Sequence, residues 1–141
     1  MQEIISDKSW ELLDKIPIQT EYDIVKGRQT VRQIAKDFSM GIVDQTRITT
    51  AVSELLRNMY MYAGGGEIIL EKGIVDGNSA MIITCTDNGP GIKDLGLAMM
   101  DGYTSGQGMG YGLPGAKRLV DRFEICSETD IGTTIRVMKW K

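Results

Sequence analysis

The sequence predicts an α+β fold, a two-layer sandwich in which three helices cover one face of a mixed, mostly antiparallel sheet. The prediction rests on the order of the segments, which is helix, helix, hairpin, loop, helix, hairpin, and on the antiparallel pairing within each hairpin. A chain of 141 residues has the length of about one domain. We therefore expect a single domain over residues 1–141, in which residues 1–20 are the least diagnostic.

The chain begins with a segment of mixed character. Residues 10–13 fit a short helix, whereas residues 16–20 look extended. Pro17 has no N–H group to donate to a neighbouring strand, so a strand in this segment belongs at the edge of the sheet.

Two amphipathic helices follow. Thr20 is a typical N-cap with Asp23 three residues later, as in a capping box, and Gly41 is expected to end the first helix. The second helix, over residues 44–64, is expected to be capped by Asp44, and it carries an unbroken apolar stripe.

The second half of the chain contains two hairpins and a third helix. Asp76, Gly77 and Asn78 form a typical hairpin turn, and Pro114 is well placed in the first turn of the third helix. No periodicity is found over residues 88–112, which predicts a long, mobile loop of functional importance. In chain order, the expected segments are strands 67–75 and 79–87, the loop 88–112, a helix over 113–123, and strands 123–128 and 133–140.

The composition narrows the chemistry. A count of 16 Lys and Arg against 19 Asp and Glu gives a net charge of −3, which argues against a nucleic-acid partner. The absence of His excludes imidazole catalysis and a phosphohistidine on this chain. Cys85 and Cys126 lie in apolar runs and are interpreted as core thiols, which fits a reducing compartment. Because no apolar run is long enough to span a membrane, we expect a cytoplasmic protein without a membrane partner.

Glu54 and Asn58 form the first candidate constellation. They are four residues apart on the second helix, so their side chains lie one turn apart at the edge of its apolar stripe. A solvated helix flank is one interpretation. The other is metal–phosphate chemistry, in which the Asn oxygen binds a hard cation and the carboxylate moves a proton.

The second constellation is the run from Asp87 to Gly91, directly after a strand of buried type. Asn, Gly and Pro make an ordinary turn. Alternatively, the Asp87 carboxylate accepts a hydrogen bond from an exocyclic amine such as that of adenine. Gly91 would then let a flat ring approach the backbone closely.

The third constellation is the alternate glycines Gly108, Gly110 and Gly112, which lead into the third helix. Their free N–H groups could wrap an anion at the helix start, although a plain flexible loop fits as well. The G-x-G-x-x-G pattern over residues 110–115 lacks the preceding strand that a dinucleotide fingerprint requires. A phosphate loop of the Walker type is excluded because no Gly-Lys-Ser/Thr follows.

Taken in order, these motifs resemble the ATP-binding boxes of the GHKL superfamily, the ATPases and kinases of the Bergerat fold, and Gly132-Thr133 completes the set. Within the superfamily the chain is similar to the small anti-sigma-factor serine/threonine kinases, which include the stressosome switch kinases. The stretches 44–51, 112–119 and 138–140 carry this similarity, which covers residues 20–141.

The resemblance implies ATP and Mg²⁺ as cofactors and assigns a role to each motif. Glu54 would be the general base, Asn58 would coordinate Mg²⁺, and Asp87 would hydrogen-bond the adenine amino group. The implied ATP-binding residues are Asn58, Asp87, Gly89, Gly91, Ile92, Gly108, Gly110, Gly112 and Thr133.

The resemblance also implies a function. The chain would phosphorylate a Ser or Thr of a STAS-domain antagonist in a stressosome-like complex. After release it would activate a downstream phosphatase or similar regulator, with a sigma factor as the output. Two alternatives stay open, namely a nucleotide-gated, anti-sigma-factor-like binding module that acts by sequestration, and a free ATPase. The oligomeric state also stays open, with a homodimer as one candidate.

Overall fold

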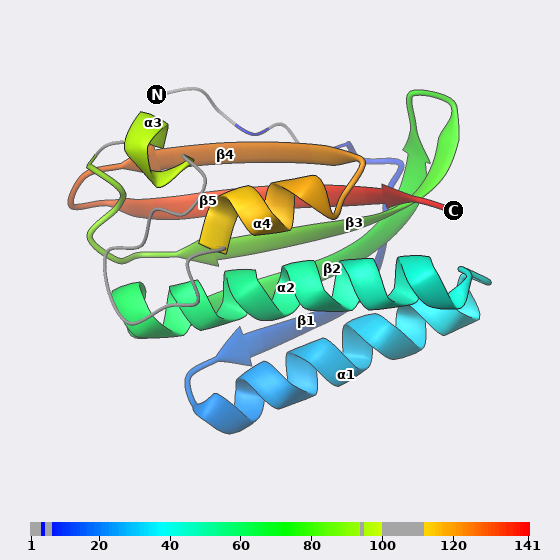
Figure 1. The fold of residues 1–141 in the computed structure, drawn as a ribbon, viewed down its shortest axis with the longest axis horizontal. Coiled ribbons are helices and arrows are strands. Elements are labelled where there is room, and N and C mark those ends of the chain that lie inside the picture. The colour runs from blue at the N-terminus through cyan, green and yellow to red at the C-terminus, as the bar shows by residue number, and fades with distance from the viewer. Residues whose placement is uncertain (1–3, 5–6, 94, 100–111) are drawn as a thin grey trace.

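The computed structural model describes residues 4, 7–93, 95–99 and 112–141. It contains a five-stranded sheet in the order β1-β2-β3-β5-β4, in which every described strand pair is antiparallel. Helices α1, α2 and α4 lie on one face of this sheet (Figure 1), which confirms the predicted two-layer α+β sandwich. The elements are β1 (Glu11–Ile18), α1 (Glu21–Asp37), α2 (Ile42–Ala63), β2 (Gly66–Val75), β3 (Asn78–Asp87), α3 (Leu95–Ala98), α4 (Gly112–Arg118), β4 (Arg122–Glu128) and β5 (Gly132–Trp140).

The first strand lies at the edge of the sheet, as Pro17 predicts. The short helix expected over residues 10–13 is wrong, because β1 already begins at Glu11 and pairs there with Lys72 of β2. An ion pair of 3.1 Å joins these two side chains. The strand is held by pairing with β2, which is a long-range contact that local sequence does not show.

The N-terminus of α1 forms the predicted capping box. The Thr20 hydroxyl accepts a hydrogen bond from the backbone N–H of Asp23, and the Asp23 carboxylate accepts one from the backbone N–H of Thr20. A further bond from the backbone N–H of Gln19 is the main reason why the pKa of Asp23 is lowered. The cap therefore fixes both the start of the helix and the path of the chain that enters it.

The boundary between α1 and α2 differs from the prediction in two ways. Gly41 does not end α1, which stops at Asp37 and reverses at Ser39 with a φ of 62°. Gly41 is instead the N-cap of α2, so Asp44 lies inside the first helical turn and is not the cap. The helix ends in a left-handed turn in which the N–H group of Met40 donates to the carbonyl of Ala35, and the Met40 side chain is buried in the core.

The core lies between the helices and the sheet. Helix α2 contributes the predicted apolar stripe and ends at Gly64 in a left-handed conformation, as expected. The cysteines are buried and free, as predicted, and burial raises the pKa of Cys85 to about 12, with a smaller contribution from the negative charge of Asp87. The fully buried large side chains of this core are Ile18, Val31, Ile48, Val52, Leu55, Leu56, Ile68, Leu70, Met81, Ile83 and Val137. Ile82 is buried in a second, smaller cluster with Val75, Ala80 and Met138.

Part of the predicted loop over residues 88–112 is helical, while residues 94 and 100–111 of that range lie outside the described residues. Residues 95–98 form the short helix α3, and Ala98 packs against the core. Helix α4 ends at Arg118, whereas the sequence predicts a helix to Phe123. Phe123 instead lies in β4, the strand at the edge of the sheet, where it pairs with Val137 of β5. Among the described residues, no helix is long and apolar enough to cross a membrane.

The capping box yields a prediction for stability. Replacing Thr20 by Ala removes the acceptor for the Asp23 N–H group, so Thr20→Ala should lower the free energy of unfolding by about 1 kcal/mol. Thr30→Ala is the matched control, since Thr30 lies within the same helix and donates only to the carbonyl of Lys26. Because alanine is the better helix former, this control should leave stability unchanged or slightly higher in urea denaturation. Equal losses in both variants would contradict the capping role.

Candidate active site

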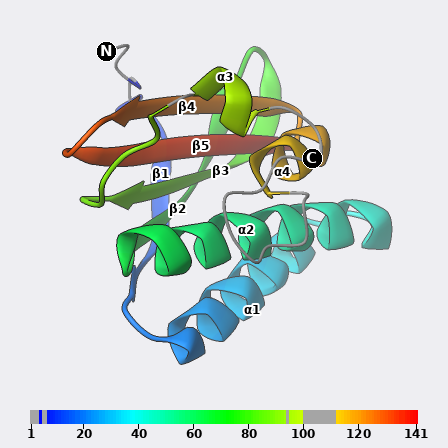
Figure 2. The same cartoon turned by 60° about the vertical axis from the view of Figure 1, so that its left-hand side comes forward.

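The predicted site residues come from elements that meet at one end of the molecule. The C-terminal end of α2, the end of β3 and the turn between β4 and β5 lie there together (Figures 1 and 2). Of the predicted site residues, Gly108 and Gly110 lie outside the described residues. The others can be placed.

Asp87 is held in a fixed orientation at the end of β3. Its Oδ1 atom accepts hydrogen bonds from the backbone N–H groups of Gly89, at 2.9 Å, and Thr133, at 3.3 Å. Thr133 reaches it because β3 and β5 pair with Asp87 opposite Thr133. Among the described residues, none makes a hydrogen bond to the second oxygen, Oδ2. The carboxylate is thus positioned by the protein and keeps one oxygen available to accept a donor.

The backbone approaches Asp87 so closely that two neighbouring positions must be glycine. A Cβ atom on Gly66 would lie 3.1 Å from Cβ of Asp87 and 2.7 Å from Sδ of Met59. Gly132 has a φ of 147°, and a Cβ there would collide with the carbonyl of Asp87. Gly66 is not among the predicted site residues, because the run of three glycines after α2 indicates only the end of a helix.

The turn that follows Asp87 is anchored on both sides. Gly89 lies on the end of α2, where a Cβ would be 2.8 Å from Cα of Ala63. Gly91 has a φ of 75° and contacts the backbone of β4. The N–H group of Ile92 donates to Oγ of Ser127 at 2.8 Å. These contacts fix the path of the turn without any bulky side chain.

Ser127 is a site residue that sequence analysis does not identify. It lies in β4 opposite Thr133, and the two hydroxyl oxygens are 2.8 Å apart. Ser127 therefore links Ile92 to Thr133, whose backbone supports Asp87. Strand alternation in the last hairpin is the signal that could have found it, since residues 127 and 133 are opposite each other.

Glu54 and Asn58 lie half-buried at the edge of the buried stripe of α2, as predicted. The Glu54 side chain is 19% exposed, and its Oε1 atom is 3.8 Å from Nη1 of Arg57. A Cβ on Gly112 would lie 3.7 Å from Nδ2 of Asn58. The structure thus brings Asn58 next to the start of α4, where the last glycine of the motif lies.

The side chains at the site could supply few ligands to a metal ion, so a cation there would be bound mainly by the oxygens of a phosphate ligand. Among the described residues, no group of three or more His, Cys, Asp or Glu side chains could hold a metal ion. The amide of Asn58 makes no hydrogen bond to any described residue, so its oxygen can act as a ligand. Mg²⁺ is commonly bound by one or two protein oxygens together with phosphate oxygens, and Asn58 matches that pattern.

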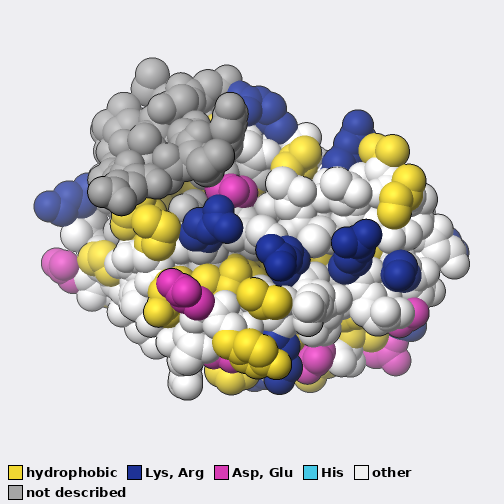
Figure 3. All heavy atoms as spheres, turned by 60° about the horizontal axis from the view of Figure 1, so that its bottom comes forward, with side chains coloured by type: hydrophobic (Ala, Val, Ile, Leu, Met, Phe, Trp, Pro, Cys, Tyr) yellow, Lys and Arg dark blue, Asp and Glu magenta, His cyan; other side chains and the backbone are white. Residues whose placement is uncertain are grey.

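The face formed by α1 and α2 carries a row of Lys and Arg side chains (Figure 3). The basic residues that are exposed on helices α1, α2 and α4 are Lys26, Arg28, Arg32, Lys36, Arg47, Arg57, Lys117 and Arg118. This face is therefore locally positive although the chain has a net charge of −3. A local positive potential favours the approach of polyanions such as nucleotides.

Comparisons with known proteins agree with this geometry. Residues 43–141 match the family described as histidine kinase-, DNA gyrase B-, and HSP90-like ATPase. The chain is 48% identical over 125 residues to the serine/threonine-protein kinase RsbT of Bacillus subtilis (strain 168), which covers 89% of this chain and 94% of that protein.

Two solved structures share the fold at 18% sequence identity. One contains the RsbU and RsbW domains of Rv1364c from Mycobacterium tuberculosis, with a TM-score of 0.61 over 91% of this chain and 32% of that chain. The other is the mycobacterial sensor histidine kinase MprB, with a TM-score of 0.57 over 90% of this chain and 96% of that chain.

The family match covers more than half of the chain, and the matching segment includes Glu54, Asn58, Asp87 and Thr133. The similarity to RsbT extends over most of both proteins. The chain therefore belongs to the family of histidine kinase-, DNA gyrase B- and HSP90-like ATPases, and it is one of the serine/threonine kinases of that family.

Proposed function

We propose that this chain binds ATP with Mg²⁺ at the end of the molecule where Asp87 lies, and that it transfers the terminal phosphoryl group to a Ser or Thr of a partner protein. The observation that carries the proposal is the orientation of Asp87. One carboxylate oxygen is held by two backbone N–H groups, and the other has no described partner. An acceptor fixed in this way suits the exocyclic amino group of adenine.

The glycines around Asp87 support this assignment. Gly66 and Gly132 keep side chains away from the carboxylate, and Gly89 and Gly91 hold the following turn against α2 and β4. A flat base can therefore approach the backbone without a steric obstacle. Ile92 and Thr133 are held beside this turn by Ser127 and would complete the adenine end of the site.

Asn58 and Gly112 would form the phosphate end. They lie next to each other, and Gly112 is the last residue of the glycine motif that also contains Gly108 and Gly110. Asn58 would hold Mg²⁺ through its amide oxygen. When bound, the cation supplies positive charge that neutralises the phosphate oxygens.

Glu54 is the proposed general base. It lies one helical turn before Asn58, and its carboxylate has only a loose contact with Arg57, at 3.8 Å. An ionised carboxylate at this place could accept the proton of an incoming hydroxyl group while the nucleotide is held by Asn58 and Asp87. The protein's contribution would then be positioning and proton removal.

The proposed acceptor is a STAS-domain antagonist protein within a stressosome-type complex. The support is the 48% identity to the serine/threonine-protein kinase RsbT, which points to Ser or Thr as the acceptor. The chain itself has no His, so it cannot carry a phosphohistidine. After release, the kinase would bind and activate a downstream phosphatase or similar regulator, which would control a sigma factor or comparable output.

Changing Asp87 to Asn tests the adenine end without removing its backbone contacts. The Asn oxygen can still accept from Gly89 and Thr133, but its NH₂ group would then face the adenine amino group, donor against donor. Asp87→Asn should weaken ATP binding by about tenfold or more. It should also reverse the preference between ATP and inosine triphosphate, whose base has an acceptor at that position. Calorimetry with both nucleotides measures this, and an unchanged preference would contradict the assignment.

Changing Asn58 to Ala tests the metal ligand. Wild type should bind ATP more tightly with Mg²⁺ than with EDTA, and Asn58→Ala should abolish this difference because the protein oxygen for the cation is lost. Asn78→Ala is a suitable control, since Asn78 lies in the hairpin turn and donates to the carbonyl of Asp76. If Asn58→Ala kept the full Mg²⁺ dependence, Asn58 would not be the ligand.

Changing Glu54 to Gln separates catalysis from binding. Transfer of radiolabelled phosphate from ATP to a STAS-domain protein should fall by about 10²- to 10⁴-fold, while the affinity for ATP stays near that of wild type. Glu71→Gln, on the face of the sheet away from the helices, should keep full transfer. Normal signalling by Glu54→Gln would favour the alternative of a nucleotide-gated binding module.

A further inference from the structure

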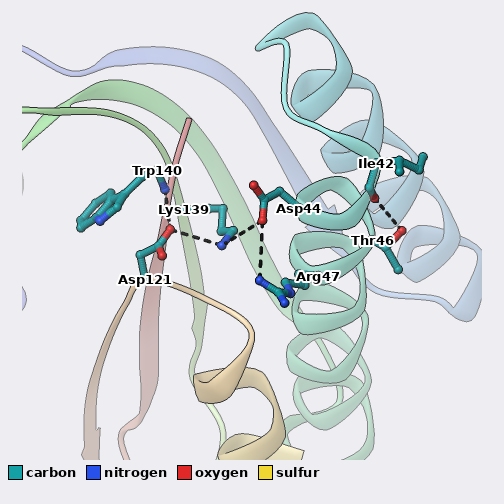
Figure 4. A network of polar contacts seen from close by, with 7 residues as sticks. All are labelled: Ile42, Asp44, Thr46, Arg47, Asp121, Lys139 and Trp140. Carbon is teal, nitrogen blue, oxygen red and sulfur yellow. Dashed lines mark hydrogen bonds and ion pairs between the residues drawn. The ribbon is translucent and has the colours of Figure 1, made fainter.

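Lys139 is a buried cation at the end of the molecule opposite to Asp87. Its side chain is 7% exposed, and its Nζ atom lies 3.4 Å from Oδ1 of Asp44 and 3.4 Å from Oδ2 of Asp121. Figure 4 shows the ammonium group between the two carboxylates. Lys139 thus forms a salt bridge with both Asp44 and Asp121, called the bridge below. It joins β5, the first turn of α2, and the connection from α4 to β4.

Each carboxylate of the bridge has a second partner. Asp121 accepts a hydrogen bond of 2.7 Å from the backbone N–H of Trp140, and Asp44 lies 3.9 Å from Arg47. Desolvating an ammonium group and its counter-charges is costly, and apolar side chains of similar size often serve stability equally well. Only the ammonium group is buried, because the side chains of Asp44 and Asp121 are 39% and 28% exposed. We therefore attribute to this salt bridge the geometry that it imposes on the three elements and not a large gain in stability.

The bridge fixes the far end of α4. This helix has seven residues, which is too short to be stable by itself. It packs on α2 through Leu113, Pro114 and Ala116. Its last turn leads to Asp121, whose backbone N–H donates to the carbonyl of Met138.

The near end of α4 lies at the proposed nucleotide site, because Gly112 is adjacent to Asn58. At 1.5 Å per residue a helix of this size is about 10 Å long, so a tilt of about 10° at the far end would move its start by about 2 Å. Such a shift is large compared with the tolerance of a ligand site.

We propose that Lys139 is a positioning residue for the phosphate end of the nucleotide site. By bridging Asp44 and Asp121 it sets the angle of α4 on α2, and so the position of Gly112 beside Asn58. This inference rests on the proposed function, since it requires that ATP phosphates bind near Asn58 and Gly112. Adenine recognition at Asp87 does not depend on the bridge.

The test compares two ligands on two variants. Lys139→Met removes the charge and keeps the length of the side chain. Lys72→Met is the matched control, because Lys72 also forms an ion pair, with Glu11 at 3.1 Å, but lies in β2 away from α4. The dissociation constants of Mg-ATP and of adenosine are measured for both variants and wild type, by displacement of a fluorescent nucleotide.

In Lys139→Met the dissociation constant for Mg-ATP should rise about three- to tenfold, whereas that for adenosine should stay within about twofold. Lys72→Met should leave both unchanged, and Lys139→Arg, which keeps the charge, should restore part of the Mg-ATP affinity. Equal weakening of both ligands, or no weakening of Mg-ATP, would overturn the positioning role. If Lys139→Met does not fold, Asp44→Asn breaks the same bridge from the exposed side and should weaken Mg-ATP selectively.

The same experiment distinguishes the failure of this inference from the failure of the proposed function. Wild type that binds Mg-ATP, together with a Lys139→Met variant that binds it equally well, overturns only the positioning role. Wild type that binds neither ligand overturns the proposed nucleotide site, and the positioning role with it.

Discussion

The pair of hydrogen bonds that ends on Oδ1 of Asp87 is the constraint on which the candidate site depends. One bond comes from Gly89 in the turn after β3 and the other from Thr133 at the start of β5, which lies 46 residues after Asp87. Hydrogen bonds to a charged acceptor contribute about 1.5–3 kcal/mol each. The carboxylate is thereby oriented before any ligand arrives, which lowers the ordering cost of binding.

The shape of the site is determined by backbone rather than by side chains. At Gly66, Gly89 and Gly132 even a methyl group would collide with a neighbouring strand or helix. The close packing of the backbone therefore accounts for glycine at these positions, whether or not a ligand binds nearby. By bringing β2, β3, β5 and α2 together at close range, they leave the surroundings of Asp87 lined by backbone.

Local signals in the sequence predict much of the fold. The capping box at Thr20, the end of α2 at Gly64 and the turn at Asp76-Gly77 each depend on a few adjacent residues, and each is found as predicted. The errors have a common cause in long-range contacts. Asp is a typical N-cap residue, but Asp44 lies inside the helix and forms an ion pair with Lys139 near the other end of the chain.

The candidate site follows the same rule. Glu54, Asn58 and Asp87 stand out in sequence because their chemistry and spacing are local. Ser127 and Gly66 do not, because their importance arises only when strands pair and when β2 approaches β3. The last helix was predicted too long for a related reason, since Phe123 is apolar enough for either element and only its pairing with β5 decides.

Strand β5 carries both the Thr133 contact to Asp87 and the Lys139 bridge to α2, at positions six residues apart and hence on the same face of the sheet. A slip of one residue in its pairing would move the Thr133 N–H group away from Asp87 and turn the Lys139 side chain to the opposite face. Both contacts, at opposite ends of the molecule, therefore depend on the same register of β5. A misregistered chain would therefore lose the Thr133 contact to Asp87 and the Lys139 contact to Asp44 at once.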